Sequence, residues 1–301
     1  MDDKILTYDE KSRGRLECTV DLSALYPSKS QFEEFKKRYH EFRRCDKSTL
    51  AVYELKGNKL TYQSEQLIPT KRDRRPPLLL VFGNPASHSV QSGMFFAFKG
   101  GKENPFWKAL LCRAGILDFG LEAQIGNEKA NRRRLKRMME VDYRSPFRIG
   151  LCVYISMPSC AGGLWSGVAG IRKLFGAQPL KKLEAFETER ILEVAKRFLT
   201  NGGIVVTFQR NAWEGLRSVN DPDYSIGNAR EGKLRGSLRG MPHIPLLGVP
   251  PTRLLGPARD VLRRVLSEQG YELLPERDRL SNLPLGSVPR SLLRSRLGIR
   301  Y

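Results

Sequence analysis

The feature that most constrains the fold is an uninterrupted apolar run, Leu78–Phe82, which leads directly into Gly83-Asn84-Pro85. Such a run is typical of a strand buried on both faces, as in the centre of a parallel sheet. Ligands of open α/β sheets bind at the carboxyl ends of the strands. The loop that starts at Gly83 is therefore the first place to expect a functional site.

Strands and helices alternate along the chain after this run. Further strands are predicted at 149–155, 204–208 and 244–249, and cap and stop residues predict helices at 104–113, 183–199 and 257–269. This alternation predicts an α/β fold, a three-layer sandwich with a mainly parallel central sheet. We expect the main domain to span residues 77–275.

Residues 1–76 are less clearly patterned, and we expect an α+β N-terminal extension of unknown role. A helix is predicted at 30–44, capped by Ser30, with a core-facing stripe of Phe32, Phe35, Tyr39 and Phe42. Short strands are predicted at 50–53 and 60–63. Residues 276–301 form a basic tail, and its stretch from Asn282 carries Arg290, Arg294, Arg296 and Arg300 and no acidic residue.

The charge balance limits the class of partner. The chain has 52 basic and 32 acidic residues, a formal net charge of +20. This favours a polyanion, either nucleic acid or an anionic membrane. Because nothing resembles a basic amphipathic membrane helix or an apolar membrane span, DNA is the favoured partner. The polar N-terminus does not resemble a secretory signal, so a cytoplasmic protein is expected.

The five cysteines are scattered and include no Cys-x-x-Cys pair. A disulfide framework or a zinc ribbon is therefore not expected, and the cysteines are predicted to be reduced, mostly buried thiols. The sequence predicts no metal and no cofactor, and we expect a monomer.

Two neighbouring segments carry the most specific motif, VFGNPASHSVQSGMFF (81–96) and ENPFWKALLCRAGI (103–116). They resemble the opening of the mismatch-specific, thymine-DNA and single-strand-selective glycosylases of the uracil-DNA glycosylase superfamily. The resemblance covers residues 78–270, with the first motif fairly specific and the rest weaker. It implies that Asn84 is the catalytic residue and that Phe96, or its neighbour Phe95, stacks on a base flipped out of DNA.

The resemblance implies further site residues. The segment GVPPTRLLGPAR (248–259) lies where the family has a loop that wedges into DNA, which assigns intercalation or DNA contact to Pro251, Thr252, Arg253 and Leu254. A plain basic loop is the alternative. The expected base-binding residues are Pro85, Ala86, Ser156 and His88, together with the two phenylalanines. His88 is equally compatible with an exposed loop histidine, and the backbone N–H groups of Ala86 and Ser87 are possible donors to the base.

The chemistry is consistent with these residues. Cleavage of an N-glycosidic bond develops positive charge on the sugar and negative charge on the base. An asparagine can hold a water through its carbonyl oxygen but is no strong base, so catalysis would depend on positioning and on stabilising the leaving base. The basic run Arg132, Arg133 and Arg134 is predicted to contact phosphates or to be a solvated face.

The chain departs from the family at three positions. Ala86 replaces a glycine, Val249 replaces a histidine, and Ser156 is the nearest polar residue where the family has a uracil-reading asparagine. The target base is therefore open between uracil, hypoxanthine and a modified cytosine, and the role is open between repair and defence against modified phage DNA. Preference for single or double strands is open too.

The sequence thus predicts a monofunctional DNA glycosylase, since no lysine lies in the motif loop to form a Schiff base. A non-catalytic DNA-binding protein on a glycosylase-like fold is the alternative. A metal-dependent nuclease is disfavoured because no carboxylate cluster follows the predicted strands.

Overall fold

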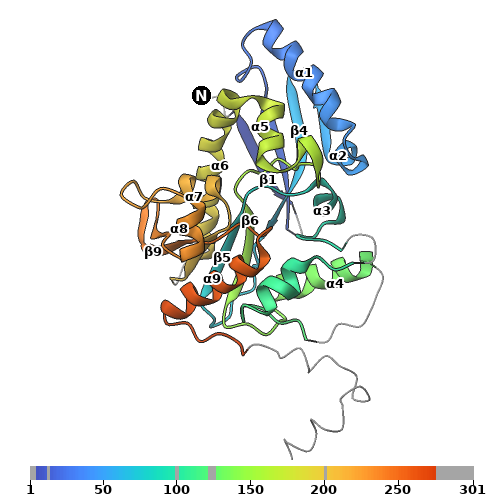
Figure 1. Ribbon diagram of the computed structural model, residues 1–301. Coiled ribbons are helices and arrows are strands. Elements are labelled where there is room, and N and C mark those ends of the chain that lie inside the picture. The colour runs from blue at the N-terminus through green and yellow to red at the C-terminus, as the bar shows by residue number, and fades with distance from the viewer. Residues whose placement is uncertain (1–4, 12–13, 99–101, 121–126, 200–201, 276–301) are drawn as a thin grey trace, which may run out of the picture.

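The computed structural model describes all residues except 1–4, 12–13, 99–101, 121–126, 200–201 and 276–301. The predicted basic tail lies outside the described residues. Within them, nine strands form one mixed sheet with the order β1-β2-β4-β6-β5-β7-β9-β8, and β3 pairs with β4 off this path. The chain is therefore a mixed α/β protein, in agreement with the predicted class (Figure 1).

The parallel part of the sheet contains the predicted apolar strands. It consists of β6 (Arg148–Val153), β5 (Pro77–Phe82), β7 (Ile204–Thr207) and β9 (Met241–Gly248). The short strand β8 (Arg235–Leu238) pairs antiparallel with β9 at the edge. All four predictions in this region are confirmed to within a few residues.

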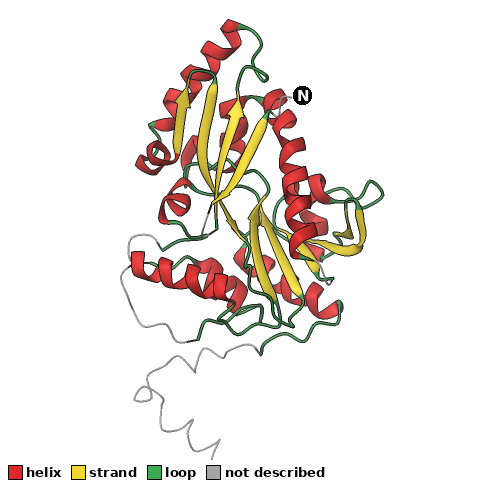
Figure 2. Ribbon diagram, turned by 180° about the vertical axis from the view of Figure 1, so that it is seen from behind, coloured by secondary structure: helices red, strands yellow, loops and turns green. Residues whose placement is uncertain are grey.

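The N-terminal region is more ordered than its sequence indicates. Four antiparallel strands, β1 (Leu6–Lys11), β2 (Arg15–Asp21), β3 (Tyr53–Lys56) and β4 (Lys59–Leu67), continue the central sheet, because Gln66 and Leu67 pair with Cys152 and Leu151 of β6. Figure 2 shows this group of strands above the parallel group. Residues 50–52, predicted as strand, belong instead to the short helix α2 (Lys47–Val52).

Helix α1 (Lys29–Arg43) confirms the predicted aromatic stripe, with Phe35, Tyr39 and Phe42 buried. The predicted cap is wrong by two residues. Ser28, not Ser30, accepts from the backbone N–H of Gln31, and the Gln31 side chain accepts from the backbone N–H of Ser28. Ser28 and Gln31 thus form the capping box of this helix.

Two apolar clusters lie on opposite faces of the sheet, because alternate residues of β5 belong to different clusters. Leu79 and Val81 contact the cluster that includes α5 (Gly167–Phe175), α6 (Ala177–Phe198) and α7 (Arg210–Leu216). Leu78 and Leu80 contact the cluster that includes three other helices: the π-helix η1 (Phe106–Cys112), α4 (Asn127–Glu140) and α9 (Leu255–Glu268).

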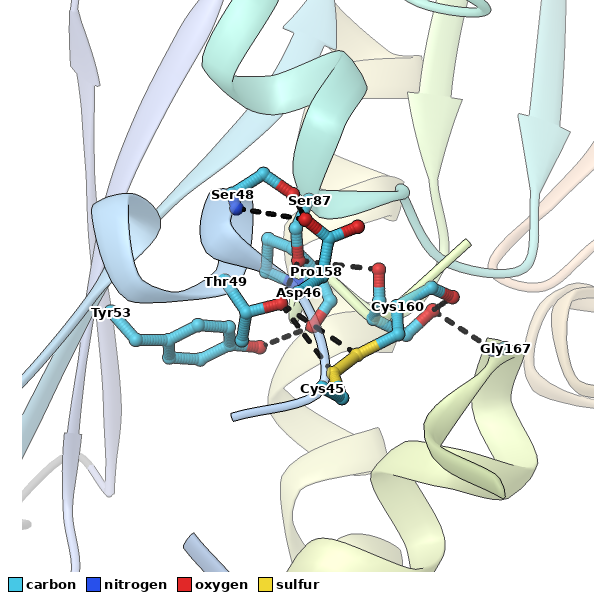
Figure 3. The surroundings of a disulfide bond; sticks show 10 residues. Cys45, Asp46, Ser48, Thr49, Tyr53, Ser87, Pro158, Cys160 and Gly167 are labelled. Atoms are coloured by element: carbon cyan, nitrogen blue, oxygen red, sulfur yellow. Dashed lines mark hydrogen bonds between the residues drawn. A yellow bond between two sulfur atoms is a disulfide. The ribbon is translucent and has the colours of Figure 1, made fainter. Parts of the chain in front are cut away.

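A disulfide joins Cys45, just before α2, to Cys160, after β6, with their Cα atoms 6.5 Å apart (Figure 3). The prediction of reduced thiols is therefore wrong for this pair. The two cysteines are 115 residues apart in sequence, and no local spacing signals their contact. Cys18 and Cys152 are buried free thiols, as predicted.

No helix among the described residues has the length and apolar character that a membrane crossing requires.

Candidate functional site

The candidate site lies at the carboxyl ends of β5 and β7. The helices η1 and α4, which follow β5, contribute to one apolar cluster, whereas α7, which follows β7, contributes to the other. Two adjacent parallel strands whose connections leave toward opposite faces create a crevice between their carboxyl ends, which is where open α/β sheets bind ligands. The sequence prediction placed the motif loop at this edge.

The two loops at this crevice approach each other closely at Gly83 and Gln209. A Cβ atom added to Gly83 would lie 2.4 Å from Oε1 of Gln209, closer than any real contact. The Gln209 amide therefore lies directly against Gly83 of the motif loop, and a larger residue at 83 would displace the flexible end of this side chain. The sequence analysis did not select Gln209, although its position one residue past the predicted strand was a usable signal.

Asn84 follows Gly83 and is half-buried. Its Nδ2 donates to the backbone carbonyls of Met157 (3.1 Å) and Pro85 (3.3 Å). Because a carbonyl can only accept, these bonds fix which end of the amide is nitrogen. Oδ1 is thus directed elsewhere and forms no hydrogen bond within the described part of the chain. An acceptor held in this way can bind a water.

The motif loop is fixed against the loop that follows β6. The backbone N–H groups of Tyr154 and Ile155 donate to the carbonyls of Phe82 and Gly83, and Ser159 donates to Pro85. Ala86 pairs with Ser159 in an isolated parallel bridge. This arrangement corrects one prediction, because the N–H of Ser87 donates to the Ser159 carbonyl (2.9 Å) and is not free for a base. Pro85 is buried, while Ala86 is partly exposed.

Side chains of the N-terminal region contact both the motif loop and the loop after β6. Oγ1 of Thr49, on α2, donates to Oγ of Ser87 at 3.2 Å, and the hydroxyl of Tyr53 donates to the carbonyl of Pro158 at 2.6 Å. Figure 3 shows these side chains grouped around the bond between Cys45 and Cys160. The N-terminal region therefore braces the motif loop.

The two candidate stacking residues differ in position. Phe95 is only 3% exposed and belongs to the core, so its predicted role in stacking on a base is wrong. Phe96 is partly exposed and adopts a left-handed backbone conformation with φ of 47°, uncommon for a bulky residue. Its ring stacks on Phe106 with centroids 3.8 Å apart, and its carbonyl accepts from Nε1 of Trp107.

This strained position is held by the second half of the motif. Oδ1 of Asn104 accepts from the backbone N–H of Phe106 at 3.0 Å, as expected of a helix cap. The helix that follows is of the π type rather than a regular α-helix, a form often associated with functional sites. Asn104, Phe106 and Trp107 thus position Phe96 at the edge of the crevice.

The prediction for Ser156 is wrong. Ser156 is fully buried, and its Oγ bonds to Oε1 of Glu187 (2.5 Å) and to the Tyr62 hydroxyl (2.8 Å). Glu187 forms a fully buried ion pair with Arg190, which donates to the carbonyls of Val153 and Tyr154. Although burial opposes its charge, the Glu187 carboxylate raises the pKa of Arg190 above its usual value. Ser156 therefore belongs to a structural network beneath the site.

A pocket of about 380 Å³ lies between the loops after β7 and β9. Pro251, Thr252 and Arg253 line it, together with Gln209 and Tyr224, so three of the four residues of this loop predicted to contact DNA lie at this pocket. Arg253 is exposed, and Leu254 is partly exposed with its N–H bonded to the Pro251 carbonyl. Tyr224, which the sequence analysis did not select, supplies an aromatic ring near Gln209.

The basic run on α4 contains one residue that cannot contact DNA. Arg132 and Arg133 are exposed, but Arg134 is only 1% exposed. Its guanidinium pairs with Glu103 at 2.6 Å and lies about 5 Å from the ring centres of Phe98, Trp107 and Phe119. The predicted phosphate contact is therefore wrong for Arg134, because the helix turns this side chain into the protein.

His88 is partly exposed on the short helix α3 (Ser87–Ser92), with Nε2 3.5 Å from the Ser89 hydroxyl. No group of three or more His, Cys, Asp or Glu residues that suits a metal ion is present in the described residues. A comparison with known protein families finds no matching family model, and no curated protein matches the chain.

Proposed function

We propose that this chain is a monofunctional DNA glycosylase that flips a nucleotide and hydrolyses its base–sugar bond, leaving an abasic site. The observation that carries the proposal is the anchored amide of Asn84 at the end of β5, with Oδ1 left as an acceptor. The resemblance of 81–96 and 103–116 to the uracil-DNA glycosylase superfamily supports the same role for Asn84.

In the proposed reaction, the bond between C1′ and the base nitrogen breaks and its electron pair leaves with the base. A water held by Oδ1 of Asn84 adds to C1′ and loses its proton to the solvent. The amide cannot accept this proton near neutral pH, so the protein contributes through position. An oxocarbenium-like centre needs little nucleophilic push, which makes a weakly activated water sufficient.

The leaving base needs donors for its developing negative charge. Nε2 of Gln209 is a neutral donor beside the motif loop, and Thr252 and Arg253 line the adjoining pocket. An amide both donates and accepts, so Gln209 can read the edge of a base in place of the asparagine that the family has after its second strand. The target is proposed to be a deaminated or modified base, uracil-like or a modified cytosine, in repair or in defence against modified phage DNA.

We also propose a three-layer sandwich for 77–275, a monomer, and action in the cytoplasm on DNA. Arg132, Arg133 and Arg253 are exposed and are proposed to contact its phosphates.

The test uses the full chain with duplexes that carry uracil, hypoxanthine, a thymine mismatch or a modified cytosine. Alkali cleaves any abasic site, and strand scission is measured on a gel. The variants are Asn84→Ala and, as a matched control, Gln91→Ala, an exposed residue of α3. We expect scission on at least one duplex, a loss of at least 100-fold in Asn84→Ala, and little change in Gln91→Ala.

Scission that persists in Asn84→Ala would contradict the assigned role. Unimpaired DNA binding without scission of any duplex would favour the alternative, a non-catalytic DNA-binding protein.

A further inference from the structure

A second cavity, of about 640 Å³, lies on the α6–α7 side of the sheet. We name it the α6–α7 cavity. Tyr154, Thr188 and Gly215 form its floor, where the Tyr154 hydroxyl bonds to Oγ1 of Thr188 at 2.8 Å. A Cβ atom on Gly215 would lie 2.1 Å from the Tyr154 hydroxyl oxygen, so the tyrosine packs directly on the α7 backbone.

Four basic side chains line this cavity: Arg172, Lys181, Arg210 and Arg239. All four residues are exposed, and within the described parts of the chain none of them forms an ion pair. Arg239 makes only long hydrogen bonds of 3.4 Å to backbone carbonyls. Like charges gathered in this way repel one another, so a bound anion would stabilise the arrangement.

The two acidic residues in the cavity, Glu184 and Glu214, offset only part of the charge of these four cations. Oε1 of Glu184 accepts from Nδ2 of Asn211 at 2.7 Å. Glu214 pairs with Arg217 at 2.7 Å and accepts from the backbone N–H of Tyr224. Glu184 keeps its negative charge because its partner is a neutral amide, whereas Arg217 offsets Glu214, so positive charge stays in excess around the cavity.

The α6–α7 cavity adjoins the pocket at the candidate site, because Arg210 and Asn211 line both. Basic side chains thus extend from Arg253, on the loop after β9, through Arg210 to Lys181 and Arg172. A row of cations that leads away from a nucleotide site is suited to the phosphates of a continuing strand.

We propose that the α6–α7 cavity binds phosphodiester groups of the DNA strand that flanks the flipped nucleotide. The inference rests on the proposed function for the identity of the polymer. It adds a contact region on the α6 and α7 face of the protein, away from the motif loop, and assigns Arg172 and Lys181 to phosphate contacts.

The test compares two double variants that remove equal charge. Arg172→Gln/Lys181→Gln removes two cavity cations, and Lys182→Gln/Lys196→Gln removes two exposed cations of α6 that lie outside the cavity. Affinity for a fluorescent duplex is measured by anisotropy at several salt concentrations. Since each phosphate contact contributes about 0.9 to the salt slope, the cavity variant should lower the slope by about 1.8. The control should change it much less.

Equal slopes in the two double variants would overturn the inference, as would a wild-type chain that does not bind DNA. Competition with inorganic phosphate and with a free nucleotide tests whether the cavity binds a small molecule rather than DNA. If micromolar amounts of either displace DNA from the wild type and the control variant but not from the cavity variant, the cavity is a small-molecule site instead. Base release at saturating protein is measured in parallel. The slope difference without any base release would leave the cavity assignment standing and contradict the glycosylase proposal.

Discussion

Arg134 and Arg133 are neighbours in one basic run, yet the structure predicts opposite consequences for their removal. Arg134 is 1% exposed, pairs with Glu103 and faces three aromatic rings. Arg133 is exposed on the same helix. Arg134→Ala should therefore destabilise the protein strongly, whereas Arg133→Ala should leave its stability almost unchanged.

The magnitude follows from the lost contacts. A desolvated cation–π contact contributes about 2 kcal/mol, and a charge-assisted hydrogen bond contributes about 1.5–3 kcal/mol. Glu103 keeps a second partner, Lys108 at 3.1 Å, so its carboxylate is not left unpaired and the loss stays moderate. We expect Arg134→Ala to lower the free energy of unfolding by about 3–5 kcal/mol. Exposed substitutions such as Arg133→Ala usually change it by about 0.5 kcal/mol or less.

Urea denaturation, followed by tryptophan fluorescence, measures both variants at one pH. A shift in midpoint with an unchanged slope would identify a loss of native-state stability. Arg134→Met is a useful third variant, because it keeps much of the apolar packing and removes the charge, so an intermediate loss is expected. If Arg134→Ala and Arg133→Ala unfold within about 0.5 kcal/mol of each other, the buried position of Arg134 is wrong.

Three further predictions concern the core, the disulfide and the crevice. Burial raises the pKa of Glu65 to about 8, above its unfolded value near 4.5, so the folded state favours the protonated carboxyl. The free energy of unfolding should therefore fall by up to about 5 kcal/mol as the pH rises from about 4.5 to 8, and Glu65→Gln should flatten this dependence in melts across that range. Cys45→Ser should lower the free energy of unfolding by up to about 4.8 kcal/mol, the loop-closure value for a separation of 115 residues. A reductant should then have no further effect on the unfolding of this variant, and an equal loss on reduction of the wild type would confirm the bond between Cys45 and Cys160. Gly83→Ala should push the flexible end of Gln209 out of place and change the free energy of unfolding by about 1 kcal/mol or less. Base release in single-turnover assays should nevertheless fall about 100-fold, and unchanged release would exclude Gln209 from the site.

The sequence predicted the central strands well because continuous apolar runs have few alternatives. It did not reveal β1 and β2, whose charged residues interrupt the run. The pattern of β2 is nonetheless regular, since Leu16, Cys18 and Val20 alternate with polar residues and are all buried. Strict alternation of apolar and polar residues indicates a strand with one buried face, but it is a weaker signal than a continuous apolar run.

The site was only partly predictable. The motif predicted Asn84 at the carboxyl end of β5, where it lies, but it left both Phe95 and Phe96 as stacking candidates, and only the structure shows that Phe95 is buried. Ser156 was predicted as a base-binding residue because it is the polar residue nearest in sequence to the place of the family's asparagine. Nearness in sequence does not determine toward which face a side chain points after a strand ends. Gln209 comes from a different strand, and its place beside Gly83 depends on the pairing of β5 with β7.

The position of Asn84 depends on a buried charge pair far away in the sequence. Glu187 bonds to the backbone N–H of Ser156, and Arg190 bonds to the carbonyls of Val153 and Tyr154, so together they fix the chain where β6 ends. That segment in turn holds Gly83 and Pro85 through its own N–H groups. An apolar pair would fill the same space, and replacing buried ion pairs in this way is often neutral or stabilising. It would supply none of these bonds, so the ion pair is best explained by the precision it gives to the loop that carries Asn84.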